Sequence, residues 1–150
     1  MAMQVEEIDH RLDALAREVT TERVPRALAR NIDLGFEGGD AMPLIAGDDF
    51  LLREMLGNLI DNASKWTNQR VDISLQGNTL VVADDGPGCP PDMLNALTQR
   101  GFRADENTPG SGLGLAIAQD IAGTYGAVLE FANNSPGLVV RITFKPGSLV

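Results

Sequence analysis

The chain has 150 residues, of which 43% are hydrophobic and 22% charged, a balance typical of one globular domain with its own core. A formal net charge of −9 and the lack of a basic stripe argue against a general nucleic-acid-binding protein. The single cysteine, Cys89, excludes an internal disulfide and a cysteine-rich zinc site. The sequence has no apolar run long enough to span a bilayer and no signal-peptide pattern. We therefore expect a cytoplasmic domain that is a piece of a larger protein.

The first third of the chain predicts one helix and two short strands. From about residue 8 to residue 30 apolar side chains recur at helical spacing, and Pro25 is expected to kink or restart this helix. The segment IDLGFEG at residues 32–38 alternates apolar and polar residues, which predicts a strand. A second short strand is predicted for PLIAG at residues 43–47.

A long amphipathic helix is predicted from about residue 49 to residue 66. Asp48 and Asp49 precede it, and acidic residues are favoured at a helix N-terminus because the orphan N–H groups there attract negative charge. The apolar positions of this segment recur every three or four residues and predict one buried stripe. This stripe comprises Leu52, Leu56, Leu59, Ile60 and Ala63.

The middle of the chain predicts a hairpin and then a second long helix. VDISLQ at residues 71–76 and TLVVADD at residues 79–85 are strands joined by a Gly77-Asn78 turn, a strong hairpin signal. A loop rich in glycine and proline follows. GLGLAIAQDIAGTYG at residues 112–126 predicts a helix that opens and closes with glycine.

The chain ends in a second predicted hairpin. AVLEFANN at residues 127–134 and LVVRITFKP at residues 138–146 flank a Ser-Pro-Gly turn at residues 135–137. Strands and helices in this mix predict an α+β fold, a two-layer sandwich. We expect a mostly antiparallel sheet with about three helices on one face.

One face of the helix predicted at residues 49–66 carries an unusual polar strip. Glu54, Asn58, Asn62 and Trp66 follow one another at intervals of four residues, with Lys65 beside them. Amide oxygens are suited to Mg²⁺, an ammonium group to phosphate and an indole to the flat face of a base. The plain alternative is a polar helix face exposed to solvent. The sequence of this helix alone supports the two interpretations about equally.

The stretch DDGPGCP at residues 84–90 follows the end of a strand. Asp84 can accept a hydrogen bond from an exocyclic amine such as the N6 amine of adenine, a donor that guanine lacks. Gly86 and Gly88 let a ligand approach the backbone. The plain alternative is an ordinary Asp-Gly turn.

The stretch PGSGLGLAI at residues 109–117 places exposed backbone N–H groups at a helix start, which predicts an anion site. Its glycines are Gly110, Gly112 and Gly114. The dinucleotide fingerprint G-x-G-x-x-G does not match, and a P-loop is excluded because no G-K-[ST] follows. A flexible loop before a helix is the alternative.

Between the two glycine runs lie some 20 residues rich in proline, asparagine and charge, a length typical of a lid. Arg100 and Arg103 are its only basic residues, and arginine is suited to phosphate. Alternatively, one or both arginines pair with Asp105 or Glu106 at the surface.

In their order, these segments resemble the ATP-binding domain shared by histidine kinases, gyrase, Hsp90 and MutL. EMLGNLIDNASKW (residues 54–66) is similar to the N box, and DDGPG (residues 84–88) to the G1 box. GSGLGL (residues 110–115) is similar to the G2 box, and RGFRADE (residues 100–106) lies where the F-box region of the lid is expected. The resemblance covers about residues 32–146.

The resemblance implies the Bergerat fold with a flexible ATP lid. It also implies a division of the chain, with residues 26–150 as the ATP-binding kinase domain. Residues 1–25 would be a residual connector helix from a missing dimerisation and phosphoacceptor domain.

One position separates the members of this superfamily. ATPases like gyrase, Hsp90 and MutL place a general-base glutamate four residues before the metal-binding asparagine, and here that position is Asn58. An amide cannot accept a proton, so hydrolysis by water is poorly supported. Transfer to a neutral imidazole needs less help, which favours sensor histidine kinases of two-component systems. The RG-x-R-x-D lid resembles PhoQ-type kinases.

The resemblance also assigns roles to the polar strip and the first glycine loop. Asn62, and with it Asn58, would coordinate Mg²⁺. Asp84 would bind the adenine amine, and Trp66 would pack on the base or ribose. Gly86 and Gly88 would let the nucleotide approach the backbone.

The phosphate end of the site is assigned in the same way. Lys65, Arg100 and Arg103 would contact phosphates. Glu54 and Asn58, one turn apart, are the candidate catalytic residues. Glu54 would orient a water or the incoming imidazole; a solvated glutamate is the alternative. The residues that would shape the phosphate rim are Gly110, Gly112, Leu113 and Gly114.

No phosphoacceptor motif surrounds the single histidine, His10, so the chain resembles the catalytic half of a kinase. The implied partners are ATP, a dimerisation domain bearing the histidine and, indirectly, a response regulator. We expect a monomeric domain, and an intact protein that is an inner-membrane sensor kinase. Two alternatives remain: a gyrase-type ATP-hydrolysing clamp, and a non-catalytic nucleotide-binding docking module.

Overall fold

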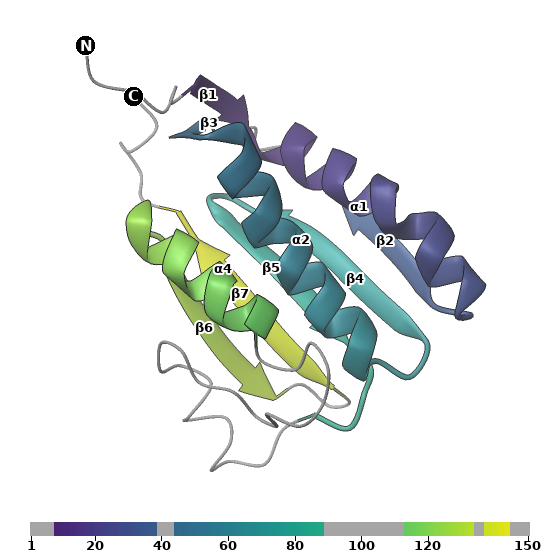
Figure 1. The fold of residues 1–150 in the computed structure, drawn as a ribbon. Helices are drawn as coiled ribbons and strands as arrows, with labels where there is room; N and C mark the ends of the chain where they lie inside the picture. The colour runs from purple at the N-terminus through teal and green to yellow at the C-terminus, as the bar shows by residue number, and fades with distance from the viewer. Residues whose placement is uncertain (1–7, 39–43, 89–112, 134–136, 145–150) are drawn as a thin grey trace.

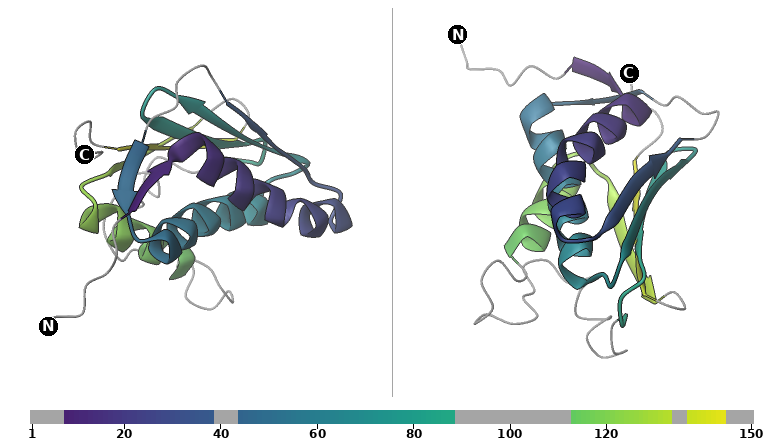
Figure 2. Two further views of the ribbon diagram at one scale, coloured as in Figure 1. Left: turned by 90° about the horizontal axis from the view of Figure 1, so that it is seen from above. Right: turned by 90° about the vertical axis from the view of Figure 1, so that its right-hand side faces the viewer.

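The computed structural model describes residues 8–38, 44–88, 113–133 and 137–144. The described residues form two layers, with a five-stranded sheet on one side and three helices packed along one of its faces (Figures 1 and 2). The predicted α+β sandwich is confirmed. The helices are α1 (Leu12–Ala29), α2 (Asp49–Trp66) and α4 (Leu113–Thr124).

The five-stranded sheet has the order β2-β4-β5-β7-β6. Its outer pair β2–β4 is parallel and every other pair is antiparallel, which makes the sheet mixed. The central strand β5 lies between β4 and β7, so its C-terminal end is held on both sides. The strands are β2 (Asp33–Glu37), β4 (Arg70–Gln76), β5 (Thr79–Asp84), β6 (Val128–Asn133) and β7 (Leu138–Thr143).

Both predicted hairpins are confirmed. Gln76 pairs with Thr79 across a two-residue loop, and Gly77 has a φ of 61°. Glycine at the first central position of such a turn matches the twist of the flanking strands. The second hairpin joins β6 to β7, with Asn133 opposite Leu138.

Helix α2 begins as its sequence predicts. The Asp48 carboxylate accepts a hydrogen bond from the Leu51 N–H at 3.0 Å, which satisfies one orphan donor of the first turn. The Asp48 N–H in turn donates to the Tyr125 hydroxyl at 3.0 Å. The whole predicted stripe of α2 is buried, and it includes Leu52, Leu56, Leu59, Ile60 and Ala63.

Two expectations for the N-terminal region are wrong. Residues 8–11 form strand β1 (Ile8–Arg11) instead of helix, and β1 pairs antiparallel with β3 (Leu44–Gly47) in a separate two-stranded sheet. Backbone pairing with a distant segment outweighs the local helical spacing there. Pro25 does not restart the helix, because α1 runs through it, and the kink that was the other expectation stays a prediction. A proline costs one helical hydrogen bond, and packing of the buried residues on both sides offsets that cost.

The core lies between the sheet and the helices. Its fully buried side chains come from α1, α2 and the inner face of the sheet, so truncating one of them costs about 2–5 kcal/mol of unfolding free energy. They include Leu12, Val19, Met55, Leu56, Ile60, Ile73, Leu80, Val82 and Ile142. The predicted boundary at residue 25 falls inside α1, and that division stays a prediction. Among the described residues, none of the helices has the length and apolar character that crossing a membrane requires.

Candidate functional site

Three of the polar residues singled out in the sequence lie at the C-terminal end of β5 and in the second half of α2. Helix α2 lies between α1 and α4 and packs against both α4 and β5 (Figure 1). Asp84 is the last residue of β5, and Asn58 and Asn62 lie in the second half of α2. The fold therefore brings into contact two elements whose candidate residues are about twenty positions apart in the sequence.

Asp84 is held in a defined orientation. Its side chain is buried, and its Oδ1 accepts hydrogen bonds from the Gly86 N–H at 2.8 Å and the Leu138 N–H at 3.4 Å. Burial raises the pKa of this carboxyl group, and the two N–H donors partly oppose that rise. Both hydrogen bonds recorded for this carboxylate within the described residues involve Oδ1. Asp84 can therefore offer Oδ2 to an amine donor.

The glycines around Asp84 allow close backbone contacts. A Cβ on Gly88, whose φ is 80°, would lie 2.9 Å from Asn133 Oδ1 and 3.1 Å from the Gly137 carbonyl oxygen. A Cβ on Gly137 would overlap the Asp84 carbonyl, and Gly137 has a φ of 101°. The sequence indicated a turn at Gly137 but not its contact with Asp84. That contact makes the β6–β7 turn part of the support for this carboxylate.

The second aspartate of the DDGPG stretch has a different role, which the sequence analysis missed. Asp85 Oδ1 accepts a hydrogen bond from the Thr67 hydroxyl at 2.7 Å and three more from the backbone N–H groups of residues 68–70 at 3.0–3.1 Å. The Asp85 carbonyl also accepts from Asn68 Nδ2 at 2.9 Å. These donors, the Thr67 hydroxyl foremost, hold the pKa of Asp85 well below its ordinary value.

Asp85 therefore fastens the loop that follows α2 to the end of β5. Trp66 is the last residue of α2, and the loop begins at the next residue. The Asp85 carboxylate, directly beside Asp84, thus links the C-terminal end of α2 to the C-terminal end of β5. The available sequence signal was an extra acidic residue after Asp84, together with a Thr-Asn pair after the helix.

The flank of α2 that carries the predicted metal ligands has one unsatisfied amide nitrogen. Asn58 is half-buried, and its Nδ2 is buried without a hydrogen-bond partner. Asn62 is also half-buried, and within the described residues no hydrogen bond is recorded for its side chain. Leaving a buried polar group unpaired costs about 1–3 kcal/mol. The unpaired atom of Asn58 is a donor that suits an acceptor on a ligand, while a metal would be bound through the amide oxygen.

The donor set suits Mg²⁺ only together with other oxygen ligands. The described residues contain no cluster of three or more His, Cys, Asp or Glu residues that could hold a metal. Two amide oxygens supply part of an octahedral shell, and Mg²⁺ commonly takes the rest from water and substrate phosphates. Asn58 and Asn62 therefore fit a metal that arrives with a polyphosphate.

The other predicted residues are placed only in part. Lys65 is half-buried in the last turn of α2, and Glu54 is exposed two turns before Asn62. Trp66 is placed by its backbone alone. Leu113 and Gly114 are the first residues of α4, at the predicted helix start. The predictions for Arg100, Arg103, Gly110 and Gly112 lie outside the described residues.

Residues 47–148 match the family described as histidine kinase-, DNA gyrase B-, and HSP90-like ATPase. The chain is 48% identical over 90 residues to the sensor protein kinase CarS of Pseudomonas aeruginosa, covering 57% of this chain and 20% of CarS. It is 35% identical over 137 residues to the two-component sensor PhoQ of the same organism, covering 88% of this chain and 29% of PhoQ.

A solved structure of full-length ShkA in complex with AMPPNP superimposes with a TM-score of 0.76 and 25% identity, covering 99% of this chain and 34% of that one. The chain spans less than a third of the length of CarS or PhoQ. Its sheet and helices form the Bergerat fold of histidine kinase ATPase domains. The chain therefore belongs to the histidine kinase-, DNA gyrase B-, and HSP90-like ATPase family, and its relatives are sensor histidine kinases.

Proposed function

We propose that this domain binds Mg-ATP between β5 and α2 and donates the γ-phosphoryl group to a histidine on a separate dimerisation domain. The observation that carries the proposal is the buried Asp84, with Oδ1 fixed by two N–H donors and Oδ2 available to an amine. The family match supports the choice of ATP, and so does the nucleotide analogue named for ShkA.

Selection of the base would rest on Asp84. The N6 amine of adenine donates a hydrogen bond that Oδ2 accepts, whereas guanine presents a carbonyl oxygen at the corresponding position and would be repelled. A buried acceptor discriminates strongly because the wrong base leaves it unpaired. Trp66 would pack on the base or ribose, and Lys65 would contact the phosphates.

Asn58 and Asn62 would hold Mg²⁺ together with phosphate oxygens, and the ion would neutralise phosphate charge. In the transfer, the bond from the γ-phosphorus to the β,γ-bridging oxygen breaks and a bond to a neutral imidazole nitrogen forms. ADP leaves, and the imidazole proton passes to solvent or to a nearby base such as Glu54. The domain contributes positioning and charge neutralisation, the main sources of rate in phosphoryl transfer.

The amide at position 58 also determines what this site does poorly. Asn58 cannot accept a proton from water, so it does not support a gyrase-type hydrolytic clamp. Further parts of the proposal are that the isolated domain is monomeric and cytoplasmic, and that the intact protein is an inner-membrane kinase. The phosphohistidine would then serve a response regulator.

A transfer assay tests the proposal. The domain is mixed with the histidine-bearing domain of the same kinase and with γ-labelled ATP and Mg²⁺, and acid-labile label on the partner is measured. We expect label with the wild type and with Asp72→Ala, an exposed surface change. We expect none with Asn62→Ala. Phosphate release without label would indicate the clamp, and ATP binding without label or release would indicate the docking module.

A further inference from the structure

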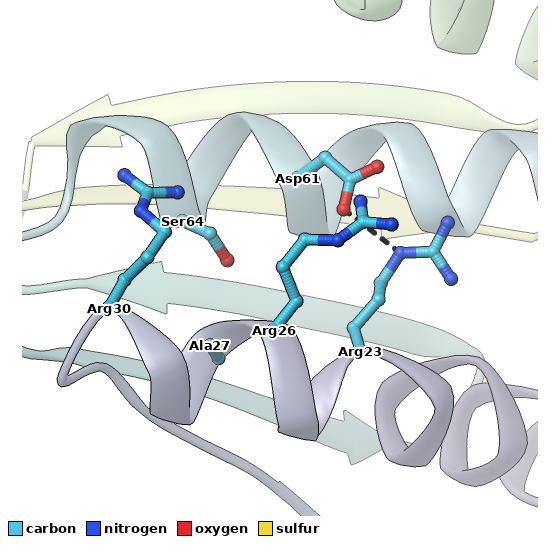
Figure 3. A pocket seen from close by; sticks show the side chains of 6 residues that line it. All are labelled: Arg23, Arg26, Ala27, Arg30, Asp61 and Ser64. Atoms are coloured by element: carbon cyan, nitrogen blue, oxygen red, sulfur yellow. Dashed lines mark hydrogen bonds and ion pairs between the residues drawn. The ribbon is translucent and has the colours of Figure 1, made fainter.

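A basic groove lies between α1 and α2. It is a cavity of about 190 Å³ into which guanidinium groups from α1 reach toward a carboxylate and a hydroxyl on α2 (Figure 3). In a chain with a net charge of −9, three cations facing one carboxylate is a marked local reversal of sign. The residues that line this groove are Arg23, Arg26, Ala27, Arg30, Asp61 and Ser64.

One arginine of the basic groove is fixed in place. Arg23 Nε donates to Asp61 Oδ1 at 2.9 Å, and its Nη1 donates to the Val19 carbonyl at 3.3 Å. The guanidinium lies over Gly57, where a Cβ would overlap Nη2 and lie 2.8 Å from Cζ. The missing side chain at Gly57 therefore makes room for Arg23. Arg23 in turn engages Asp61, the one carboxylate among the described residues that line the groove, and lies 3.9 Å from Glu22 beside it.

The other two arginines of the basic groove are not held in this way. Arg26 and Arg30 are exposed, and within the described part of the chain no ion pair or hydrogen bond is recorded for either guanidinium. They lie four residues apart on one helix face, where like charges repel. An anion placed between them would relieve that repulsion.

At the other end of the interface between α1 and α2, the charge of an arginine is neutralised by carboxylates. There Arg53 of α2 pairs with Glu18 at 2.6 Å, with Asp49 at 3.0 Å and with Glu22 at 3.8 Å. One arginine thus has three carboxylates, whereas in the basic groove Arg23 takes both Asp61 at 2.9 Å and Glu22 at 3.9 Å, and neither pairs with Arg26 or Arg30 within the described residues. The surplus positive charge is confined to the C-terminal half of α1.

The spacing of the unpaired arginines indicates the shape of the anion. Four helical residues span about 6 Å along the axis. In an extended chain, side chains on the same face repeat about every 6.6 Å. We propose that the basic groove docks an extended acidic segment of a partner protein, with carboxylates at alternate positions on Arg26 and Arg30. The Ser64 hydroxyl can donate to the same segment, and each guanidinium can bind its carboxylate through two N–H groups.

Docking there leaves the nucleotide site open. Asp61 and Asn62 are consecutive residues, so their side chains leave α2 about 100° apart. Asp61 turns to α1, as its bond to Arg23 shows, and the flank of Asn62 is a separate surface. The docking proposal therefore stands or fails independently of ATP binding.

The test uses a synthetic peptide that alternates glutamate with threonine, titrated into the domain at low salt while backbone amide resonances are followed. Low salt is needed because screening weakens exposed charge pairs. We expect shifts centred on residues 23–30 and 57–64. Arg26→Gln combined with Arg30→Gln should weaken binding by about tenfold or more. Arg70→Gln removes an exposed arginine on β4 and should leave affinity within about twofold.

Three results would overturn the proposal. The first is equal affinity of the double variant and the wild type. The second is equal binding of a peptide that alternates glutamine with threonine. The third is a response of the groove amides to inorganic phosphate with no response to the acidic peptide, which would indicate a small-anion site. Circular dichroism of each variant checks that it folds, and both substituted arginines are exposed.

Discussion

At the end of β5, Asp84 and Asp85 accept hydrogen bonds from backbone N–H groups of two turns, whereas on α2 the amide of Asn58 keeps a buried nitrogen without a partner. The first region has its polar groups satisfied by the protein itself. The second holds a buried donor that is left without a partner. A satisfied network is rigid, and a buried donor without an acceptor costs free energy. The comparison teaches that the fold itself fixes the carboxylates at the end of β5, whereas it leaves an amide nitrogen of α2 unpaired.

The largest effect is expected from breaking the support of the β5 end. Gly137→Ala places a side chain against the Asp84 carbonyl at a φ of 101°, so we expect about 3 kcal/mol or more of lost stability and a much lower Tm. Thermal unfolding measures it. Gly123→Ala is the control, because Gly123 lies in α4 with nothing within 4 Å of an added Cβ. Equal Tm values for the two variants would contradict the proposed role of Gly137.

The next largest effect is expected from removing the Asp85 hydrogen bonds that link the end of α2 to the end of β5. Asp85→Ala removes the acceptor for the Thr67 hydroxyl and the N–H groups of residues 68–70. We expect Tm to fall by roughly 5 °C and ATP affinity to fall as well, since the end of α2 is released. Asp72→Ala, which loses only an exposed pair with Arg70, should change Tm by about 1 °C or less. An Asp85→Ala variant that kept full affinity would show that the link does not position the site.

On α2, replacing Asn58 is expected to change the stability of the domain and its affinity for ATP in different ways. Asn58→Ala removes a buried unpaired nitrogen, so the ligand-free domain should be as stable as the wild type or more stable by about 1 kcal/mol. Affinity for ATP should fall about tenfold in Mg²⁺ and much less in EDTA. Denaturant unfolding and calorimetry measure the two quantities. Loss of stability without loss of Mg²⁺-dependent affinity would make Asn58 a structural residue.

The smallest effect on Tm is expected when Asp84 and Asp85 are each replaced by asparagine. The raised pKa of Asp84 means that its ionised form destabilises the fold above that pKa, so Asp84→Asn should raise Tm at pH 7. The lowered pKa of Asp85 means that its stabilisation is present above the unfolded pKa and is lost as pH falls through the folded one. Asp85→Asn should therefore lower Tm at pH 7. The Asp84 difference should shrink as pH falls toward the ordinary aspartate pKa, whereas the Asp85 difference should persist there and shrink only at lower pH. Shifts of the same sign at pH 7 would contradict the comparison.

The parts of the fold that sequence predicts well are those that depend on local signals. Helix α2 was predictable because its Asp48 cap and its apolar stripe are contiguous, and the β4–β5 hairpin because Gly77-Asn78 specifies its turn. Strand β1 was not predictable, because its partner β3 lies more than thirty residues away and residues 8–11 have helical spacing. The restart expected at Pro25 does not occur for a related reason, since core packing outweighs the local cost of the proline.

The candidate site follows the same rule. Asp84 and the asparagines were found because their residue types and spacing indicate chemistry on their own. The role of Asp85 depends on a loop some fifteen residues earlier in the chain, and that of Gly137 on a contact across the sheet. Neither partner can be read from the neighbouring sequence. Long-range contacts that support a functional group are thus the part that only the fold supplies.

The most direct test of the central claim is calorimetric titration of the wild-type domain and of Asp84→Asn with ATP and with GTP, both in Mg²⁺. Replacing Oδ2 by an N–H group removes a charged acceptor worth about 1.5–3 kcal/mol, so affinity for ATP should fall about 10–100-fold. GTP should bind the wild type weakly or not at all. If ATP and GTP bind alike and the substitution changes neither affinity, Asp84 does not select adenine and the proposed nucleotide site is wrong.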